Sequence, residues 1–230
     1  MGARRSGQVR RLKHRQQPRA HQLRIGVHDG LEAQMLSSSL RRMNEEHEGF
    51  DPVVRMAPFG ALRSMLENGL VDVLLESRDP HGEPDGASVF RRMLDCPSVC
   101  VCSPENPLAG RDRVGLDELA DGGRLAVGDP HHCAAATVEI QRAAASHMPP
   151  ERVMMAYNIE VALALASAGV AFTVQAGIPA MEVPLLRYIP IEGLPVVTLG
   201  VRVRRGRRTA VLDHFLEVLA EQLRRTPELR

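Results

Sequence analysis

Four short loops contain the residues that the sequence places best for binding a small molecule. They lie at residues 28–30, 57–60, 128–132 and 175–177. Each follows a segment with strand-like alternation and precedes a helical or turn-rich segment. In an open α/β sheet, ligands bind beyond the carboxyl ends of strands, where helix N-termini offer unpaired N–H donors. These loops are therefore the predicted binding site, and their donors favour a carboxylate-bearing metabolite.

The candidate ligand-binding residues come from these loops and from the loop at 103–109. They are His28, Asp29, Gly30, Pro58, Phe59, Gly60, Ser103, Asp129, His131, His132, Gln175 and Ala176.

Two aspartates among these candidates have a second role open to them. Asp29 precedes a helical segment, and Asp129-Pro130 is a helix N-capping signature. One side chain can both cap a helix and contact a ligand, so both roles stay open. Asp29 would repel a carboxylate, which makes a neutral or cationic ligand the alternative.

The run at 131–133, His-His-Cys, raises the question of a metal site. Adjacent helical residues point about 100° apart, so the two histidines cannot chelate one ion with good geometry. Zinc would need distant ligands such as Cys100 or Cys102. We predict no metal and no cofactor. His28 and His132 suit pH-sensitive ligand contacts better, because imidazole titrates near neutrality.

The same loops supply little for catalysis. An enzyme needs a nucleophile beside a base, or paired carboxylates, whereas the loops offer Asp29, Asp129 and histidines. Lys13 is the only lysine, which leaves no Schiff-base or phosphate-binding lysine for a folded pocket. We predict a binding protein with no catalytic residues, and an enzyme on the same fold is the alternative.

The elements that must position these loops form two successive series of strands and helices. In the first, strands are predicted at 23–27, 52–56, 71–75 and 88–94, and helices at 31–47 and 61–67. In the second, strands are predicted at 98–102, 124–127, 152–156, 170–174, 188–191 and 196–204, and helices at 116–120, 133–146, 159–168 and 208–225. This alternation predicts an α/β fold with largely parallel sheets.

The formal net charge of +1 conceals an uneven distribution. Residues 1–24 hold eight of the 29 basic residues and no acid, so the other 206 residues carry a net charge of about −7. That part should repel nucleic acid. The basic leader at 1–21 contains Pro18 and has no apolar face, and we predict that it is disordered.

Four cysteines indicate the compartment. Cys96, Cys100, Cys102 and Cys133 form no C-x-x-C pair, and buried thiols in a reducing cytoplasm are favoured over disulfides. The sequence has neither an apolar run of about 18 residues nor a secretory signal, so we predict no membrane contact.

Four segments, in order and at workable spacings, resemble the effector-binding domain of LysR-type transcriptional regulators. They are 23–27 with the helix that follows, 62–73 with its Asn-Gly-Leu step, 103–109 with Asn106-Pro107-Leu108-Ala109, and 161–179. Together they span nearly all of 22–225.

The resemblance implies a two-lobed fold like that of type-two periplasmic binding proteins, with mixed, mainly parallel sheets. A small-molecule effector would bind between the lobes. Lobe one is expected at 22–101 plus 201–230 and lobe two at 102–200. The hinge is expected near 100–103 and 199–201.

Regulators of this family normally begin with a winged helix-turn-helix, which does not fit into 21 residues. The chain is expected to be a fragment, a mis-started frame or a free-standing sensor, with DNA contacted only through a helix-turn-helix absent from it. A secreted solute-binding protein is a further alternative, disfavoured by the missing signal peptide and the four cysteines.

Effector domains of this kind pair side by side, so a homodimer or homotetramer is expected. Met35 and Met43 in the helix at 31–47 give it more apolar surface than one sheet face needs, which predicts a pairing surface there. The alternative is that both methionines face their own sheet.

Overall fold

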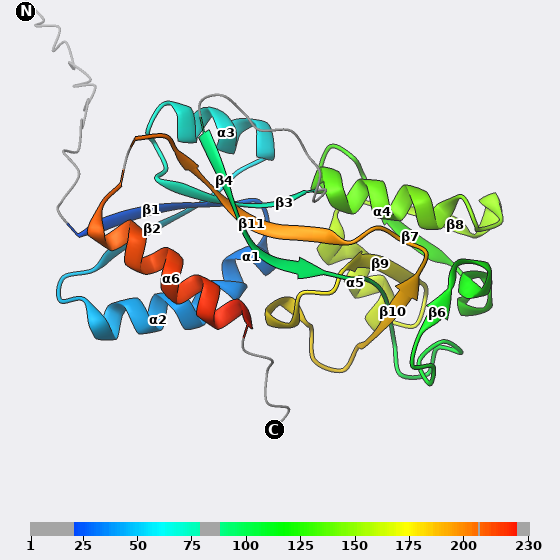
Figure 1. The fold of residues 1–230 in the computed structure, drawn as a ribbon. Helices are drawn as coiled ribbons and strands as arrows, with labels where there is room; N and C mark the ends of the chain where they lie inside the picture. The colour runs from blue at the N-terminus through cyan, green and yellow to red at the C-terminus, as the bar shows by residue number, and fades with distance from the viewer. Residues whose placement is uncertain (1–20, 79–87, 207, 225–230) are drawn as a thin grey trace, which may run out of the picture.

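The computed structural model describes residues 21–78, 88–206 and 208–224, in which two β-sheets are flanked by helices (Figure 1). The strands of the first sheet lie in the order β2-β1-β3-β11-β4, and those of the second in the order β6-β10-β5-β9-β7-β8. The predicted two-lobed α/β architecture with mixed sheets is confirmed. The predicted leader, apart from His21, lies outside the described residues.

The first sheet comprises β1 (Gln22–Val27), β2 (Asp51–Met56), β3 (Val73–Arg78), β4 (Ser88–Cys96) and β11 (Val197–Arg204). Its helices are α1 (Gly30–Met35), α2 (Ser37–Glu46), α3 (Phe59–Glu67) and α6 (Ala210–Arg224). Strands β1, β2 and β3 are parallel, and β11 is antiparallel to both β3 and β4.

The second sheet comprises β5 (Ser98–Cys102), β6 (Val114–Gly115), β7 (Leu125–Gly128), β8 (Val153–Ala156), β9 (Phe172–Ala176) and β10 (Arg187–Glu192). Its helices are α4 (Ala135–Ala145), α5 (Ile159–Ser167) and the 3-10 turns η1 (Leu116–Gly122), η2 (Pro150–Arg152) and η3 (Pro179–Met181). Strands β7, β8 and β9 are parallel, and β5 is antiparallel to β9 and β10.

The chain passes between the sheets twice, at Pro97 and at 193–196. Both points lie a few residues before the hinge segments expected at 100–103 and 199–201, because β5 already belongs to the second sheet and β11 to the first. The division into lobes at 101/102 and 200/201 stays a prediction.

The helix predicted at 31–47 is two helices, α1 and α2, which meet at Leu36. At the junction the Ser37 hydroxyl donates to the Gln34 carbonyl oxygen at 2.7 Å. A serine hydroxyl of this kind competes for a carbonyl that a continuous helix would use, and serine is a weak helix former.

The two methionines of this region belong to the core of their own lobe. Met35 is 3% exposed and Met43 is fully buried, both in the main core cluster, and α6 packs against α2, which carries Met43. The expectation that Met43 faces another chain was wrong, because the amphipathic α6 already covers this surface. All four cysteines are buried free thiols, as predicted.

Candidate functional site

The carboxyl end of β1 leads directly into a tightly bonded turn. Asp29 is the N-cap of α1, and its Oδ1 accepts from the Glu32 N–H at 2.8 Å. In return Glu32 Oε2 accepts from the His28 N–H at 2.6 Å. Each of the two carboxyl groups thus accepts from a backbone N–H, and together they close the first turn. Asp29 has the predicted capping role.

An aromatic contact joins this turn to the loop after β2. The rings of His28 and Phe59 are stacked, with centroids 3.9 Å apart and an interplanar angle of 22°. Phe59 is the first residue of α3, so the helix begins two residues before its predicted start. Pro58 and Gly60 are exposed on either side of Phe59.

The second sheet presents a turn after β7, but α4 begins only at Ala135 with Ala134 as its N-cap, so the helix-capping role predicted for Asp129 was wrong. Asp129 Oδ1 accepts from the His131 N–H at 2.8 Å, and the Asp129 N–H donates to the Ala156 carbonyl oxygen at 2.9 Å. His132 stacks on Tyr157, with ring centroids 4.0 Å apart. His131 is exposed beside them.

A buried amide fixes the start of this turn. Gln141, 2% exposed on α4, accepts from the Gly128 N–H at 2.8 Å and donates to the Val174 carbonyl oxygen at 2.9 Å. It therefore ties α4 to β7 and β9 at the end of the sheet that carries the loops. Sequence reasoning missed it, because a single glutamine in an alanine-rich helix gives no sign of burial.

The two turns touch each other across the space between the sheets. The His28 ring donates from Nε2 to the His132 carbonyl oxygen at 3.0 Å, and the Gly30 N–H donates to Glu160 Oε1 at 3.0 Å. Leu31 packs in the cluster that contains Ile159 of α5. Glu160, which sequence reasoning also missed, lies in the first turn of α5 and meets a residue 130 positions away.

Carboxyl groups dominate the electrostatics of this contact. Burial raises the pKa of Asp29, and the nearby Glu160 adds to that effect. Burial and the Asp29 charge raise the pKa of Glu32 to about 8. Glu76, on β3, behaves differently: its burial is outweighed by hydrogen bonds from Arg202 and Arg63, so its pKa is lowered.

Two buried polar atoms at the contact lack a hydrogen-bond partner within the described part of the chain. They are Nδ1 of His28 and Oε2 of Glu160. His28 follows β1 of the first sheet, and Glu160 lies in α5, which packs on the second sheet. Buried polar atoms are normally bonded, so each indicates room for a partner.

The remaining predicted site residues lie elsewhere. Gln175 and Ala176 are the buried last residues of β9, at the same end of the second sheet as the contact. Ser103 follows β5, which runs antiparallel to β9, so it lies at the opposite end. There it lines a separate hollow of about 480 Å³ with Arg124 and Gly169. The structure does not bring Ser103 together with the other candidates.

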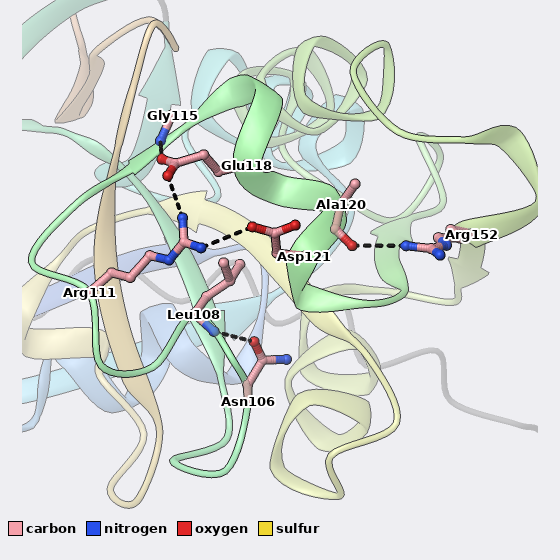
Figure 2. A network of polar contacts seen from close by, with 8 residues as sticks. All are labelled: Asn106, Leu108, Arg111, Gly115, Glu118, Ala120, Asp121 and Arg152. Atoms are coloured by element: carbon pink, nitrogen blue, oxygen red, sulfur yellow. Dashed lines mark hydrogen bonds and ion pairs between the residues drawn. The ribbon is translucent and has the colours of Figure 1, made fainter.

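The loop that begins at Ser103 is held by a polar network (Figure 2). Asn106 Oδ1 accepts from the Leu108 N–H at 3.0 Å, and its Nδ2 donates to the Gly122 carbonyl oxygen at 3.0 Å. Arg111 pairs with Glu118 and Asp121 of η1. The Asn106-Pro107 motif is thus explained by the bonds that shape this loop.

In the three described ranges, no group of three His, Cys, Asp or Glu side chains could hold a metal ion. Burial raises the pKa of the Cys133 thiol to about 11, so this cysteine beside the two histidines keeps its proton near neutral pH.

The described helices include none with the length and apolar character that a membrane span requires.

The chain has two β-sheets, each flanked by helices, and crosses between them twice. Loops from the carboxyl ends of parallel strands meet between the sheets. This arrangement defines a ligand-binding fold of the periplasmic-binding-protein kind. The chain belongs to the LysR substrate binding domain family, whose model matches residues 16–224.

Solved structures agree with this assignment at the level of fold. The BenM effector binding domain with its effector benzoate has a TM-score of 0.69 and 15% identity, covering 87% of this chain and 90% of that one. The reduced OxyR regulatory domain from Pseudomonas aeruginosa has a TM-score of 0.65 and 15% identity, with coverages of 89% and 98%. A hydrogen-peroxide-bound OxyR variant from Corynebacterium glutamicum has a TM-score of 0.68 and 21% identity, with coverages of 87% and 64%. Among curated proteins, none matches this sequence.

Proposed function

We propose that this chain is the effector-sensing part of a LysR-type transcriptional regulator and binds a small molecule between its two sheets. The observation that carries the proposal is the direct bonding of the loop ends, His28 to His132 and Gly30 to Glu160. A ligand that enters there replaces these bonds and changes how the sheets meet. BenM, solved with its effector benzoate, provides a precedent for the fold.

The binding residues in this proposal come from three loops. They are His28, Asp29, Gly30, Pro58, Phe59, Gly60, Asp129, His131 and His132, and we add Glu32, Tyr157 and Glu160, which contact these loops. Gln175 and Ala176 support them from the end of β9. The effector is bound and not transformed, since these loops bring together no nucleophile and base of the kind catalysis requires.

The family also supports a proposal about the DNA contact, the oligomeric state and the location of the regulator. In this proposal the regulator contacts DNA through a helix-turn-helix and not through the described sheets, and it works as a homodimer or homotetramer. The four reduced, buried cysteines favour the cytoplasm.

The test is a melting-temperature screen against small organic metabolites. A ligand present at 100 times its Kd stabilises by about 2.7 kcal/mol, which for a domain of this size is a rise of about 5–10 °C. Phe59→Ala, which removes the ring stacked on His28, should abolish most of the rise. Leu70→Ala, at an exposed position beyond the far end of α3, is the matched control.

A ligand that stabilises the Phe59→Ala and parent proteins equally binds elsewhere and contradicts the proposal. A product assay on every stabilising compound distinguishes a sensor from an enzyme, because a sensor returns its ligand unchanged.

A further inference from the structure

The hollow lined by Ser103 takes no part in the proposed function, because it lies at the end of the second sheet opposite to the loops that meet between the sheets. Its volume of about 480 Å³ is in the range of pockets that hold small molecules. Its walls come from the loop after β5, the turn before β7 and the chain that follows α5. Strand pairing brings these three segments together, since β9 pairs with both β5 and β7.

Ser103 places a buried hydroxyl group at this hollow. The residue is 5% exposed, and its hydroxyl group has no hydrogen-bond partner in the described part of the chain. Its oxygen lies beside Gly169, where an added Cβ atom would be 3.8 Å from it. Buried polar groups are normally bonded, and a hydroxyl group can both donate and accept. Ser103 therefore indicates a ligand that supplies the missing bonds.

The end of α5 supplies hydrogen-bond acceptors to the same hollow. The chain that turns back after this helix bonds to the carbonyl oxygens of residues 164–166. The next two residues, Ser167 and Ala168, line the hollow, and their carbonyl oxygens accept no such bond from the described residues. The last carbonyl groups of a helix form the negative end of its dipole and favour a positive group. The carboxylate of Glu105, which also lines the hollow, adds to this preference.

Arg124 supplies the opposite charge. Its side chain is exposed, lines the hollow and pairs with no carboxylate among the described residues. Its carbonyl oxygen accepts from the Phe172 N–H at 2.8 Å, which fixes the backbone of Arg124 next to the chain that follows α5. A guanidinium group can bind a carboxylate through two parallel hydrogen bonds. The hollow thus has one positive and one negative region.

The wall that carries Ser103 and Glu105 is held in place by bonds within the chain. Asn106 Nδ2 donates to the Gly122 carbonyl oxygen at 3.0 Å, which ties the loop after β5 to the turn before β7. Asn106 Oδ1 accepts from the Leu108 N–H at 3.0 Å (Figure 2). A site that is already ordered loses less conformational freedom when a ligand binds.

A ligand with a single charge would suit only one side of this hollow. An anion would meet Glu105 and the end of α5, and a cation would meet Arg124. We propose that the hollow is a second ligand site, which binds a free amino acid. The carboxylate of the amino acid pairs with Arg124, its ammonium group donates to the carbonyl oxygens at the end of α5, and the Ser103 hydroxyl bonds between the two.

The test is calorimetric titration of the full chain with each of the common L-amino acids. At least one should bind with a Kd on the order of 1 mM, because an open hollow holds a small ligand through few polar contacts. The N-acetyl and amide derivatives of that amino acid each lack one of its two charges, and they should bind at least about tenfold more weakly. Equal binding of either derivative, or no binding of any amino acid at millimolar concentration, would overturn the proposal.

Two substitutions test the residues that carry the proposal. Arg124→Gln should weaken binding at least about tenfold, and Ser103→Ala about three- to tenfold. Ser38→Ala and Arg41→Gln, at exposed positions of α2, are the matched controls and should bind as the parent does. Ser103→Ala should keep the melting temperature of the parent, because the hydroxyl group makes no bond within the described residues. Parent-like binding by both site variants would contradict the assignment.

The location of the ligand is measured by NMR on ¹⁵N-labelled protein. The amide signals of Gly123 and Gly169, which line the hollow, should shift on binding, and that of Gly30 should not. Phe59→Ala, which alters the site between the sheets, should leave amino acid binding unchanged. An amino acid that shifts Gly30 instead, and no longer binds to Phe59→Ala, occupies the site between the sheets. That outcome supports the proposed function and overturns the second site.

Discussion

Glu32 is 4% exposed, and its carboxyl group has other carboxyl groups as neighbours. Burial and the Asp29 charge raise its pKa from the ordinary 4.5 to about 8 in the folded chain. Between these two values the unfolded carboxyl is ionised while the folded one keeps its proton. Folding therefore binds a proton, and this group's contribution to stability falls as pH rises through that window.

Glu32→Gln should remove this pH dependence, because an amide stays neutral and its oxygen can still accept from the His28 N–H. The free energy of unfolding of the parent should fall relative to the variant by up to about 1.4 kcal/mol per pH unit between pH 5 and 8. Urea denaturation across that range measures the difference. Parallel curves for the two proteins would show that Glu32 is already ionised in the folded state.

At the residue scale, the sequence predicted the roles of side chains that bond to near neighbours in the chain. It missed the roles of side chains that bond to distant segments. Asp29 as a helix cap follows from its place before an apolar helix, and it was confirmed. Glu160 and Gln141 look like ordinary helix residues in the sequence. Their roles come from segments that only the folded sheets bring close, so no local pattern marks them.

At the element scale, α4 depends on one amide for its attachment to the second sheet. Gln141→Leu keeps the size of the side chain but leaves the Gly128 N–H and Val174 carbonyl without their partner. Each buried unsatisfied group costs about 1–3 kcal/mol. We expect thermal unfolding to show a loss in that range or above, and Glu139→Leu, at an exposed position of the same helix, to show little change.

One position in helix α2 allows a substitution that should raise the stability of the protein. The Ser39 hydroxyl is fully buried, and within the described ranges it has no hydrogen-bond partner. Ser39→Ala removes the buried hydroxyl and adds a better helix former, so stability should rise by about 0.5–2 kcal/mol. Chemical denaturation should show no such gain for the exposed Ser38→Ala. A destabilised Ser39→Ala protein would mean that the hydroxyl has a partner.

Periodicity predicted most strands and helices, and the errors lie at their ends and junctions. The helix at 31–47 was predicted unbroken, because the apolar spacing continues across Leu36 while the break arises from a serine side chain. The alternation within 98–102 gives no sign of which sheet the strand joins. Sheet membership depends on pairing with β9 and β10, far away in sequence.

At the scale of the whole molecule, a substitution at Met43 tests whether this side chain stabilises the folded chain or an interface between chains. Its side chain is fully buried between α2 and the core that α6 covers. Met43→Glu should therefore unfold the chain, because a buried unpaired carboxylate costs several kcal/mol. Circular dichroism and sedimentation distinguish the cases: a folded monomer from this variant would show that Met43 belongs to an interface.

The two passages between the sheets lie side by side. Strands β4 and β11 pair up to Cys96 and Val197, and in the next step the Ser98 hydroxyl donates to the Pro195 carbonyl oxygen at 2.7 Å (Figure 1). Two separate tethers would let the sheets twist and slide independently, whereas two tethers bonded to each other act as one strap that bends about a single axis. We therefore expect the two sheets to move relative to each other mainly by bending about this axis. A ligand bound between the sheets should then open or close the angle between them, and sliding or twisting motions should be small.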